Sequence, residues 1–165
     1  MSLIENIVSS VTTREPQGTI HVVDRSPLNW LYITYNTVEE LVRTGEKGHI
    51  VPAAMKSYRW VDDRTLEIKL RENKFRDGEP ITVEIVKRSF EEMMRWKSPH
   101  PPGTQFNQYE GTRCEIIDEE TVHIISPKPD GMTLGKLRAM HVMNTRFWEG
   151  PSFGYKRNGS GEGHW

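Results

Sequence analysis

The chain has 165 residues, of which 35% are hydrophobic and 27% are charged, and its formal net charge at pH 7 is −1. This length suits one domain with a sizeable core, and the near-neutral charge argues against a nucleic-acid partner, which would favour a concentrated basic surface. The single cysteine, Cys114, excludes an internal disulfide framework. We expect no membrane span, because no run of about 18 apolar residues is present, and we see no signal peptide at the start of the chain.

Residues 1–18 are predicted to form an N-terminal segment, either disordered or a short amphipathic helix over Met1–Arg14, where apolar residues recur at helical spacing. A short strand is expected at Thr19–Val23. The segment Thr37–Arg43 starts with a threonine suited to an N-cap, so we expect a short helix there. The glycines of Gly45–Gly48 indicate a turn.

Two strands are predicted next, at Tyr58–Val61 and Leu66–Leu70, joined as a hairpin by Asp62-Asp63-Arg64. The second strand alternates leucine or isoleucine with charged residues, which is typical of a strand with one buried face. We expect Tyr58 and Trp60 to lie on opposite faces, one buried and one at an edge.

Asp77-Gly78 supplies a tight turn before the main predicted helix. Thr82 is placed to cap that helix, which we expect to run to about Trp96 or Lys97. Its apolar residues recur at helical spacing and predict one buried face: Val83, Val86, Phe90 and Met93. The three prolines of residues 98–103 then predict a loop.

A second hairpin is predicted from Arg113–Ile117 and Thr121–Ser126, which bracket Asp118-Glu119-Glu120. Leu134–Met143 is expected to be a helix or a helix followed by a strand, and Arg146–Trp148 to begin a short closing element. Residues 150–165 are a Gly/Ser-rich tail, predicted to be loop or disordered. This hairpin-rich order predicts an α+β (mixed α/β) domain with mainly antiparallel strand pairs.

The sequence offers little for catalysis or for a cofactor. None of the six histidines lies in an H-E-x-x-H frame, and Cys114 has no histidine at a diagnostic metal-ligand spacing, so we expect no metal and no cofactor. The paired carboxylates Asp62-Asp63 and Asp118–Glu120 fall at predicted hairpin tips, where turn formation explains them. Cys114 and His123 could imitate a nucleophile and its base across a hairpin, but Cys114 is more simply a small core residue.

The stretch from residue 52 to residue 91 carries a run of motif residues in a fixed order and spacing: Pro52-Ala53-Ala54-Met55-Lys56-Ser57-Tyr58, Asp62-Asp63, Leu70-Arg71, Phe75, Asp77-Gly78-Glu79-Pro80, Thr82, Val86 and Ser89-Phe90-Glu91. In this order and spacing the stretch resembles the solute-binding proteins of ABC importers, in the peptide- and nickel-type class called extracellular solute-binding family 5. Val83 and Ile85 stand where that family usually has Ala and Asp.

The resemblance implies a periplasmic-binding-protein type II fold, of which residues 19–149 would be part of the first lobe. It implies a non-enzymatic component that captures a peptide, an opine-like compound or a metal chelate and passes it to an ABC transporter permease. The full-length protein would then be periplasmic or extracellular and membrane-associated. Because members close two lobes around the ligand, we expect a fragment that binds weakly or not at all alone, and an exposed apolar lobe surface that favours homo-oligomers.

Ligand contacts, on this reading, come from the loop after the first strand and from the region after the main helix. Amide, aromatic and guanidinium groups there suit a peptide or a carboxylate: Asn29, Trp30, Gln105, Asn107, Arg138 and His141. Two alternatives stay open. One is a stand-alone interaction module that docks to a partner through its sheet edge. The other, a hydrolase built on Cys114 and His123, is the weakest.

Overall fold

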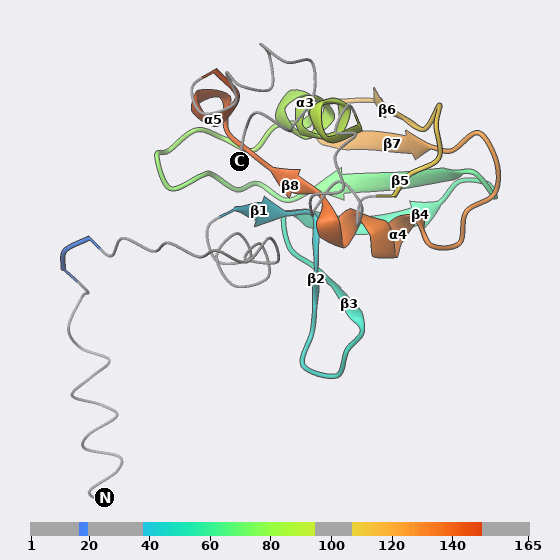
Figure 1. The fold of residues 1–165 in the computed structure, drawn as a ribbon, viewed down its shortest axis with the longest axis horizontal. Coiled ribbons are helices and arrows are strands. Elements are labelled where there is room, and N and C mark those ends of the chain that lie inside the picture. Colours follow the sequence, from blue (N-terminus) through green and yellow to red (C-terminus); the bar gives the residue numbers. More distant parts are fainter. Residues whose placement is uncertain (1–16, 20–37, 95–106, 150–165) are drawn as a thin grey trace, which may run out of the picture.

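The computed structural model of the chain describes residues 17–19, 38–94 and 107–149 (Figure 1). The expected N-terminal helix, nearly all of the strand expected at 19–23, the loop at 98–103 and the tail at 150–165 lie outside these residues. In the described part of the chain, no helix has the length and apolar character needed to cross a membrane.

Short strands and helices make up the fold. The strands are β1 (Glu39–Glu40), β2 (Val42–Thr44), β3 (Ile50–Pro52), β4 (Met55–Trp60), β5 (Thr65–Leu70), β6 (Arg113–Ile116), β7 (Thr121–Ile125) and β8 (His141–Val142). The helices are α3 (Val83–Met94), α4 (Thr133–Lys136), the 3-10 helix η2 (Leu137–Ala139) and α5 (Thr145–Glu149). The predicted mixture of helix and sheet is confirmed.

An antiparallel sheet of order β4-β5-β7-β6 forms one layer of the structure. Its outer pairs, β4–β5 and β6–β7, are the two predicted hairpins, and both predictions are confirmed. The strands β5 and β7 pair at the centre of the sheet, where Ile68 lies opposite Val122. Both of these side chains are fully buried.

Helix α3 packs on one face of this sheet, against β6 and β7 (Figure 1). It begins after Thr82, whose hydroxyl accepts a hydrogen bond from the backbone N–H of Ile85 at 3.4 Å, as the predicted N-cap requires. The four apolar residues predicted to face inward are all buried.

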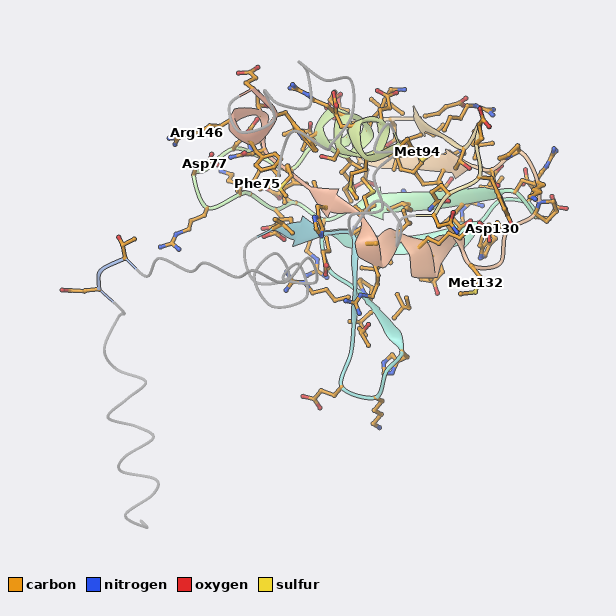
Figure 2. The ribbon with its side chains drawn as sticks, in the orientation of Figure 1. Phe75, Asp77, Met94, Asp130, Met132 and Arg146 are labelled. Carbon is orange, nitrogen blue, oxygen red and sulfur yellow. The ribbon has the colours of Figure 1, made fainter. Side chains whose placement is uncertain are left out.

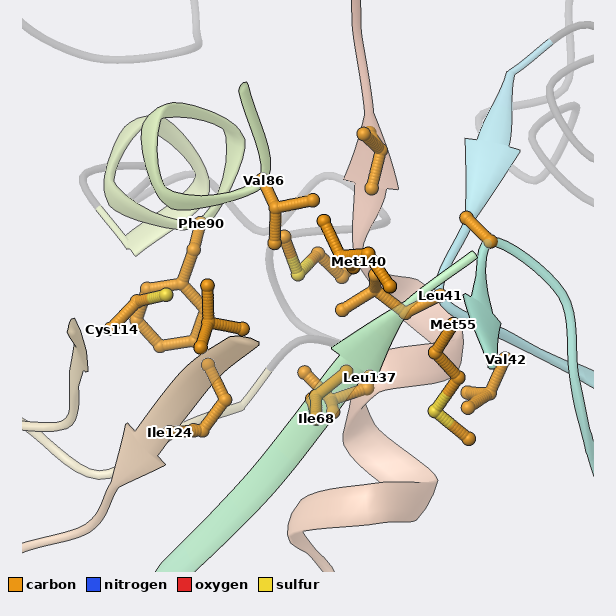
Figure 3. Packing of buried hydrophobic residues seen from close by; sticks show 14 of the residues in the cluster. Leu41, Val42, Met55, Ile68, Val86, Phe90, Cys114, Ile124, Leu137 and Met140 are labelled. Atoms are coloured by element: carbon orange, nitrogen blue, oxygen red, sulfur yellow. The ribbon is translucent and has the colours of Figure 1, made fainter. Parts of the chain in front are cut away.

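The core lies where α3, the sheet and the segment around η2 meet. Figure 3 shows Phe90 of α3 over Cys114 and Ile124, and Leu137 beside Ile68. Burying each large side chain of this kind contributes about 1.5–3 kcal/mol relative to leaving it exposed. The core therefore joins residues that are far apart in the sequence into one unit.

The segment after the second hairpin is a helix followed by a strand, which confirms one of the two predicted forms. Helix α4 continues into η2, and β8 follows directly. Strand β8 does not join the main sheet; it pairs with β1, with Glu40 opposite His141 and Glu39 opposite Val142. A second two-stranded pair, β2–β3, closes around the predicted turn at residues 45–48.

The turn at Asp77-Gly78 is anchored to α5, and Figure 2 shows Asp77 and Arg146 at the same end of the molecule. Gly78 has a φ of +92°, which favours glycine. The Asp77 carboxylate accepts a hydrogen bond from the side-chain amide of Asn144 at 2.6 Å. Glu79 accepts two more from the backbone and hydroxyl of Thr145, at 3.0 and 2.6 Å. These contacts hold the start of α5 against the turn.

The prediction of a helix at Thr37–Arg43 is wrong. This segment is extended, because Glu39–Glu40 pairs with β8 and Val42–Thr44 pairs with β3. A single turn of helix is unstable alone, so partners elsewhere in the chain decide the conformation of so short a segment.

The expectation for Tyr58 and Trp60 is also wrong. Residues two apart on a strand point to the same face, and both aromatics are exposed, at 44% and 40%. Strand β4 is an edge of the sheet, so neither ring is covered on both sides.

Candidate functional site

The predicted ligand residues are only partly described. Asn29, Trp30 and Gln105 lie outside the described residues. Asn107 is exposed in the segment that leads to β6. Arg138 and His141 lie three residues apart on η2 and β8, and the structure brings them to β1 and β2.

There they join a buried polar group that we call the Glu40 cluster: Glu40, Arg43, Thr44, Arg138 and His141. Glu40 and His141 are both 1% exposed. The Nε atom of Arg43 lies 3.6 Å from Oε2 of Glu40. The guanidinium of Arg138 donates a hydrogen bond to the Thr44 hydroxyl, and the backbone N–H of His141 donates to the Met93 sulfur at 3.1 Å.

Burial dominates the electrostatics of this cluster. It raises the pKa of Glu40 to about 7, although the charges of Arg138 and Arg43 act in the opposite direction. Burial also lowers the pKa of His141 to about 4, so this imidazole is neutral at pH 7. With two guanidinium groups and one half-ionised carboxylate, the cluster carries an excess of positive charge, which suits an anionic group such as a carboxylate.

Sequence reasoning missed three members of the cluster. In the sequence, Glu40 stands beside Glu39, and the pair resembles the solvated surface of the expected short helix. Arg43 and Thr44 resemble the end of that helix. The only local signal was the adjacent pair Leu41-Val42, both fully buried. A two-residue strand is too short to show a period, so the burial of Glu40 depends on β8.

A second polar group lies on the face of the main sheet opposite α3. The strand register places Arg59, Glu67, His123 and Glu115 in one row across β4, β5, β7 and β6. Arg59 donates two hydrogen bonds to Glu67, at 2.6 and 2.9 Å, and the His123 ring lies 3.0 Å from the same carboxylate. The Arg59 and His123 hydrogen bonds hold the pKa of Glu67 below its usual value. The row is a network of paired groups centred on the largely buried Glu67.

Cys114 and His123 do not form a nucleophile and base. Cys114 lies opposite Ile124 and faces α3, whereas His123 lies on the other face of the sheet and pairs with Glu67. Burial raises the pKa of the Cys114 thiol to about 12, so it carries almost no thiolate at neutral pH. Cys114 is the core residue that its alternating position predicts.

An open hollow of about 420 Å³ lies beside the first hairpin tip, next to Trp60, Asp62, Asp63 and residues 129–131. Its carboxylates have structural partners. Asp62 accepts hydrogen bonds from the backbone of Arg64 and Thr65, both at 2.8 Å, and Asp130 pairs with Lys136 at 2.6 Å. Neither Asp62 nor Asp130 is therefore available as a ligand for a cation in the hollow. Across residues 38–94 and 107–149, no three His, Cys, Asp or Glu side chains gather as a metal site would require.

Comparison with known proteins assigns the family. The sequence profile described as "Bacterial extracellular solute-binding proteins, family 5 Middle" matches residues 49–162, which is more than half of the chain. The chain belongs to this family. The predicted resemblance is confirmed, and family 5 members are solute-binding proteins of ABC importers.

Individual family 5 relatives agree. The chain is 39% identical over 64 residues to the nickel-binding protein NikA of Staphylococcus aureus. The crystal structure of that NikA in complex with Ni(L-His)2 superposes with a TM-score of 0.56 at 26% identity, over 66% of this chain and 23% of NikA. The crystal structure of a putative peptide-binding protein, AppA of Clostridium difficile, superposes with a TM-score of 0.60 at 26% identity, over 78% of this chain and 28% of AppA. These likenesses confirm the periplasmic-binding-protein type of fold.

The chain spans only a small part of these family 5 relatives. It covers 13% of the NikA sequence and about a quarter of each solved structure. The family profile covers the hairpin-and-helix body together with the segment that carries Arg138 and His141.

Proposed function

We propose that this chain forms part of the solute-binding component of an ABC importer, and that it takes part in binding a small solute, such as a peptide or a related compound, without catalysing a reaction. The observation that carries the proposal is the family match over residues 49–162. The relatives named for nickel binding and for peptide binding support a role in solute capture.

We further propose that residues 19–149 correspond to part of the first lobe, with an ABC permease as the protein partner and a periplasmic or extracellular location. Enclosure of the solute would then require a second lobe, since closure of two lobes excludes water from the ligand. For the 165-residue chain by itself we expect affinity no better than about millimolar, which corresponds to about 4 kcal/mol of binding free energy.

The proposed ligand residues are Arg138 and His141 of the Glu40 cluster, together with Asn29, Trp30, Gln105 and Asn107. A guanidinium can bind a solute carboxylate through two parallel hydrogen bonds. The neutral imidazole of His141 can accept or donate one hydrogen bond at neutral pH. The positive excess of the cluster supports a solute with a carboxylate group.

The test is an NMR titration of the ¹⁵N-labelled chain with two probes, a Ni(II)–L-histidine complex and trialanine. We expect saturable shifts or broadening at residues 138–143 that disappear in Arg138→Gln. Arg64→Gln is the matched control, because Arg64 is exposed at a hairpin tip, 3.7 Å from Asp63. If neither probe at about 10 mM changes these signals, the assignment of Arg138 and His141 fails.

A stand-alone interaction module is the second candidate, and one observation favours it. The edge strand β4 exposes Tyr58 and Trp60, and Val61 beside them is 45% exposed. Exposed aromatics on a strand edge suit a partner that adds a strand or a second copy of the chain. Light scattering after size exclusion tests the second copy: a dimer that becomes monomeric in Tyr58→Ser/Trp60→Ser supports it, and a monomeric wild-type chain removes it.

A further inference from the structure

Glu40 is the most unusual side chain in the described structure. Its carboxylate is 1% exposed, and within residues 38–94 and 107–149 neither of its oxygens accepts a hydrogen bond. The Nε atom of Arg43 approaches Oε2 of Glu40 at 3.6 Å. A buried carboxylate without hydrogen bonds favours its protonated form.

His141 lies directly opposite Glu40 in the pairing of β1 with β8. Residues directly opposite in an antiparallel pair point to the same face, so a buried acid and a buried base share one face of a pair that is only two residues long. His141 is also 1% exposed, and burial favours its uncharged form for the same reason.

The charged groups around Glu40 come from each neighbouring segment. Arg138 of η2 and Arg43 of β2 favour ionised Glu40, and Glu39 of β1 disfavours it. The loss of hydration on burial is larger than these effects, and its net result is a pKa of about 7 for Glu40. For His141, burial lowers the pKa to about 4.

We propose that the contact between β1 and β8 is a pH-sensitive joint, held while Glu40 and His141 are both uncharged and loosened when either side chain becomes charged. The joint connects the β2–β3 hairpin to η2. Both side chains belong to the described fold, so the joint does not depend on a bound solute.

The two side chains give the joint opposite pH dependences. Glu40 binds its proton more tightly in the closed joint, so its contribution weakens the joint as pH rises from about 4.5 to about 7. His141 binds its proton less tightly in the closed joint, so its contribution strengthens the joint as pH rises from about 4 to about 6.5. In the wild-type chain the two dependences nearly cancel between about pH 5 and 7.

Amide hydrogen exchange at residues 39–42 and 140–143, corrected for intrinsic exchange rates, separates the two contributions. In Glu40→Gln we expect protection to rise about 30-fold from about pH 5 to 8, because only His141 still titrates. In His141→Gln we expect it to fall about 70-fold over the same range. The double variant should show little pH dependence of protection. Glu46→Gln is the control, because Glu46 is exposed in the turn between β2 and β3 and is not among the groups that shift the pKa of Glu40, so it should behave like wild type.

A direct titration of the wild-type chain keeps the proposal testable if a variant does not fold. The Glu40 carboxyl carbon should titrate with a midpoint near 7, and the His141 ring with a midpoint below about 5. A Glu40 midpoint below about 5.5 would overturn the joint. If protection changed with pH in the same direction in both single variants, the joint would also be overturned. The same holds if the pH-dependent changes in protection were equally large in the central strands β5 and β7.

Discussion

Ser89 provides a sharp test of how the two halves of the described chain are held together. Its hydroxyl on α3 is fully buried. The oxygen accepts hydrogen bonds from the backbone N–H of Met143 at 3.1 Å and from the indole N–H of Trp148 at 3.3 Å. One buried oxygen therefore ties α3 to the segment between β8 and α5.

Replacing Ser89 with Ala removes this acceptor from two buried donors. A buried donor that loses its partner costs about 1–3 kcal/mol, and the longer bond to Trp148 belongs at the low end. Alanine recovers about 0.5 kcal/mol through its better helix propensity. The net expectation is a loss of about 2–3 kcal/mol in the free energy of unfolding.

Ser126→Ala is the matched control. Ser126 is also buried, at 3% exposure, but within the described part of the chain its hydroxyl makes no hydrogen bond. Removing a buried hydroxyl that has no partner should change stability by less than about 1 kcal/mol, and in the stabilising direction. The two variants delete the same atom from two buried sites that differ in their hydrogen bonds.

Urea denaturation followed by circular dichroism at 222 nm measures both changes. With a urea dependence of about 1–3 kcal/mol per molar, Ser89→Ala should lower the unfolding midpoint by about 1–2 M, and Ser126→Ala should leave it nearly unchanged. Equal losses in both variants would refute the reasoning, since they would show that volume rather than hydrogen bonding sets the cost. A loss below about 0.5 kcal/mol in Ser89→Ala would refute it as well.

Three further outcomes are expected. Because burial raises the pKa of Cys114 to about 12, a thiol reagent such as DTNB should modify the native chain very slowly at pH 8 and rapidly in urea; fast native labelling would contradict this. Gly78→Ala should cost about 1 kcal/mol, since Gly78 has a φ of +92°, whereas Gly131→Ala, with open space around its position, should cost less in the same urea assay. The pKa of Glu67 is lowered in the folded state, so its contribution is present above its unfolded pKa and is lost as pH falls; Glu67→Gln should unfold with a weaker acid dependence below about pH 5, and an unchanged dependence would count against it.

The central body of the fold could be predicted from local patterns. Strand β5 alternates apolar and charged residues, and α3 carries both a cap at Thr82 and an apolar face at helical spacing. The turn at Asp77-Gly78 needs a residue that accepts a positive φ. Each of these signals is local, because neighbours in the sequence are also neighbours in the element.

The same locality explains the resemblance to family 5, which rests on the β4–β5 hairpin, the turn and α3. These elements follow one another directly in the chain, and the family match covers all of them. Arg138 and His141 could be named as candidates from their residue types and their position in the chain. The other members of the Glu40 cluster could not be predicted from the sequence.

Tertiary structure alone decided the rest. The Thr37–Arg43 segment became two strands because β3 and β8 offered partners, and no local preference in so few residues can outweigh such pairing. Glu40 became buried because β8 and η2 close over it, and this burial raises its pKa. Local sequence determined the elements with a repeating pattern. Long-range contacts determined strand β1 and the electrostatics of Glu40, because the pairing of β1 and the burial of Glu40 depend on β8, about a hundred positions away.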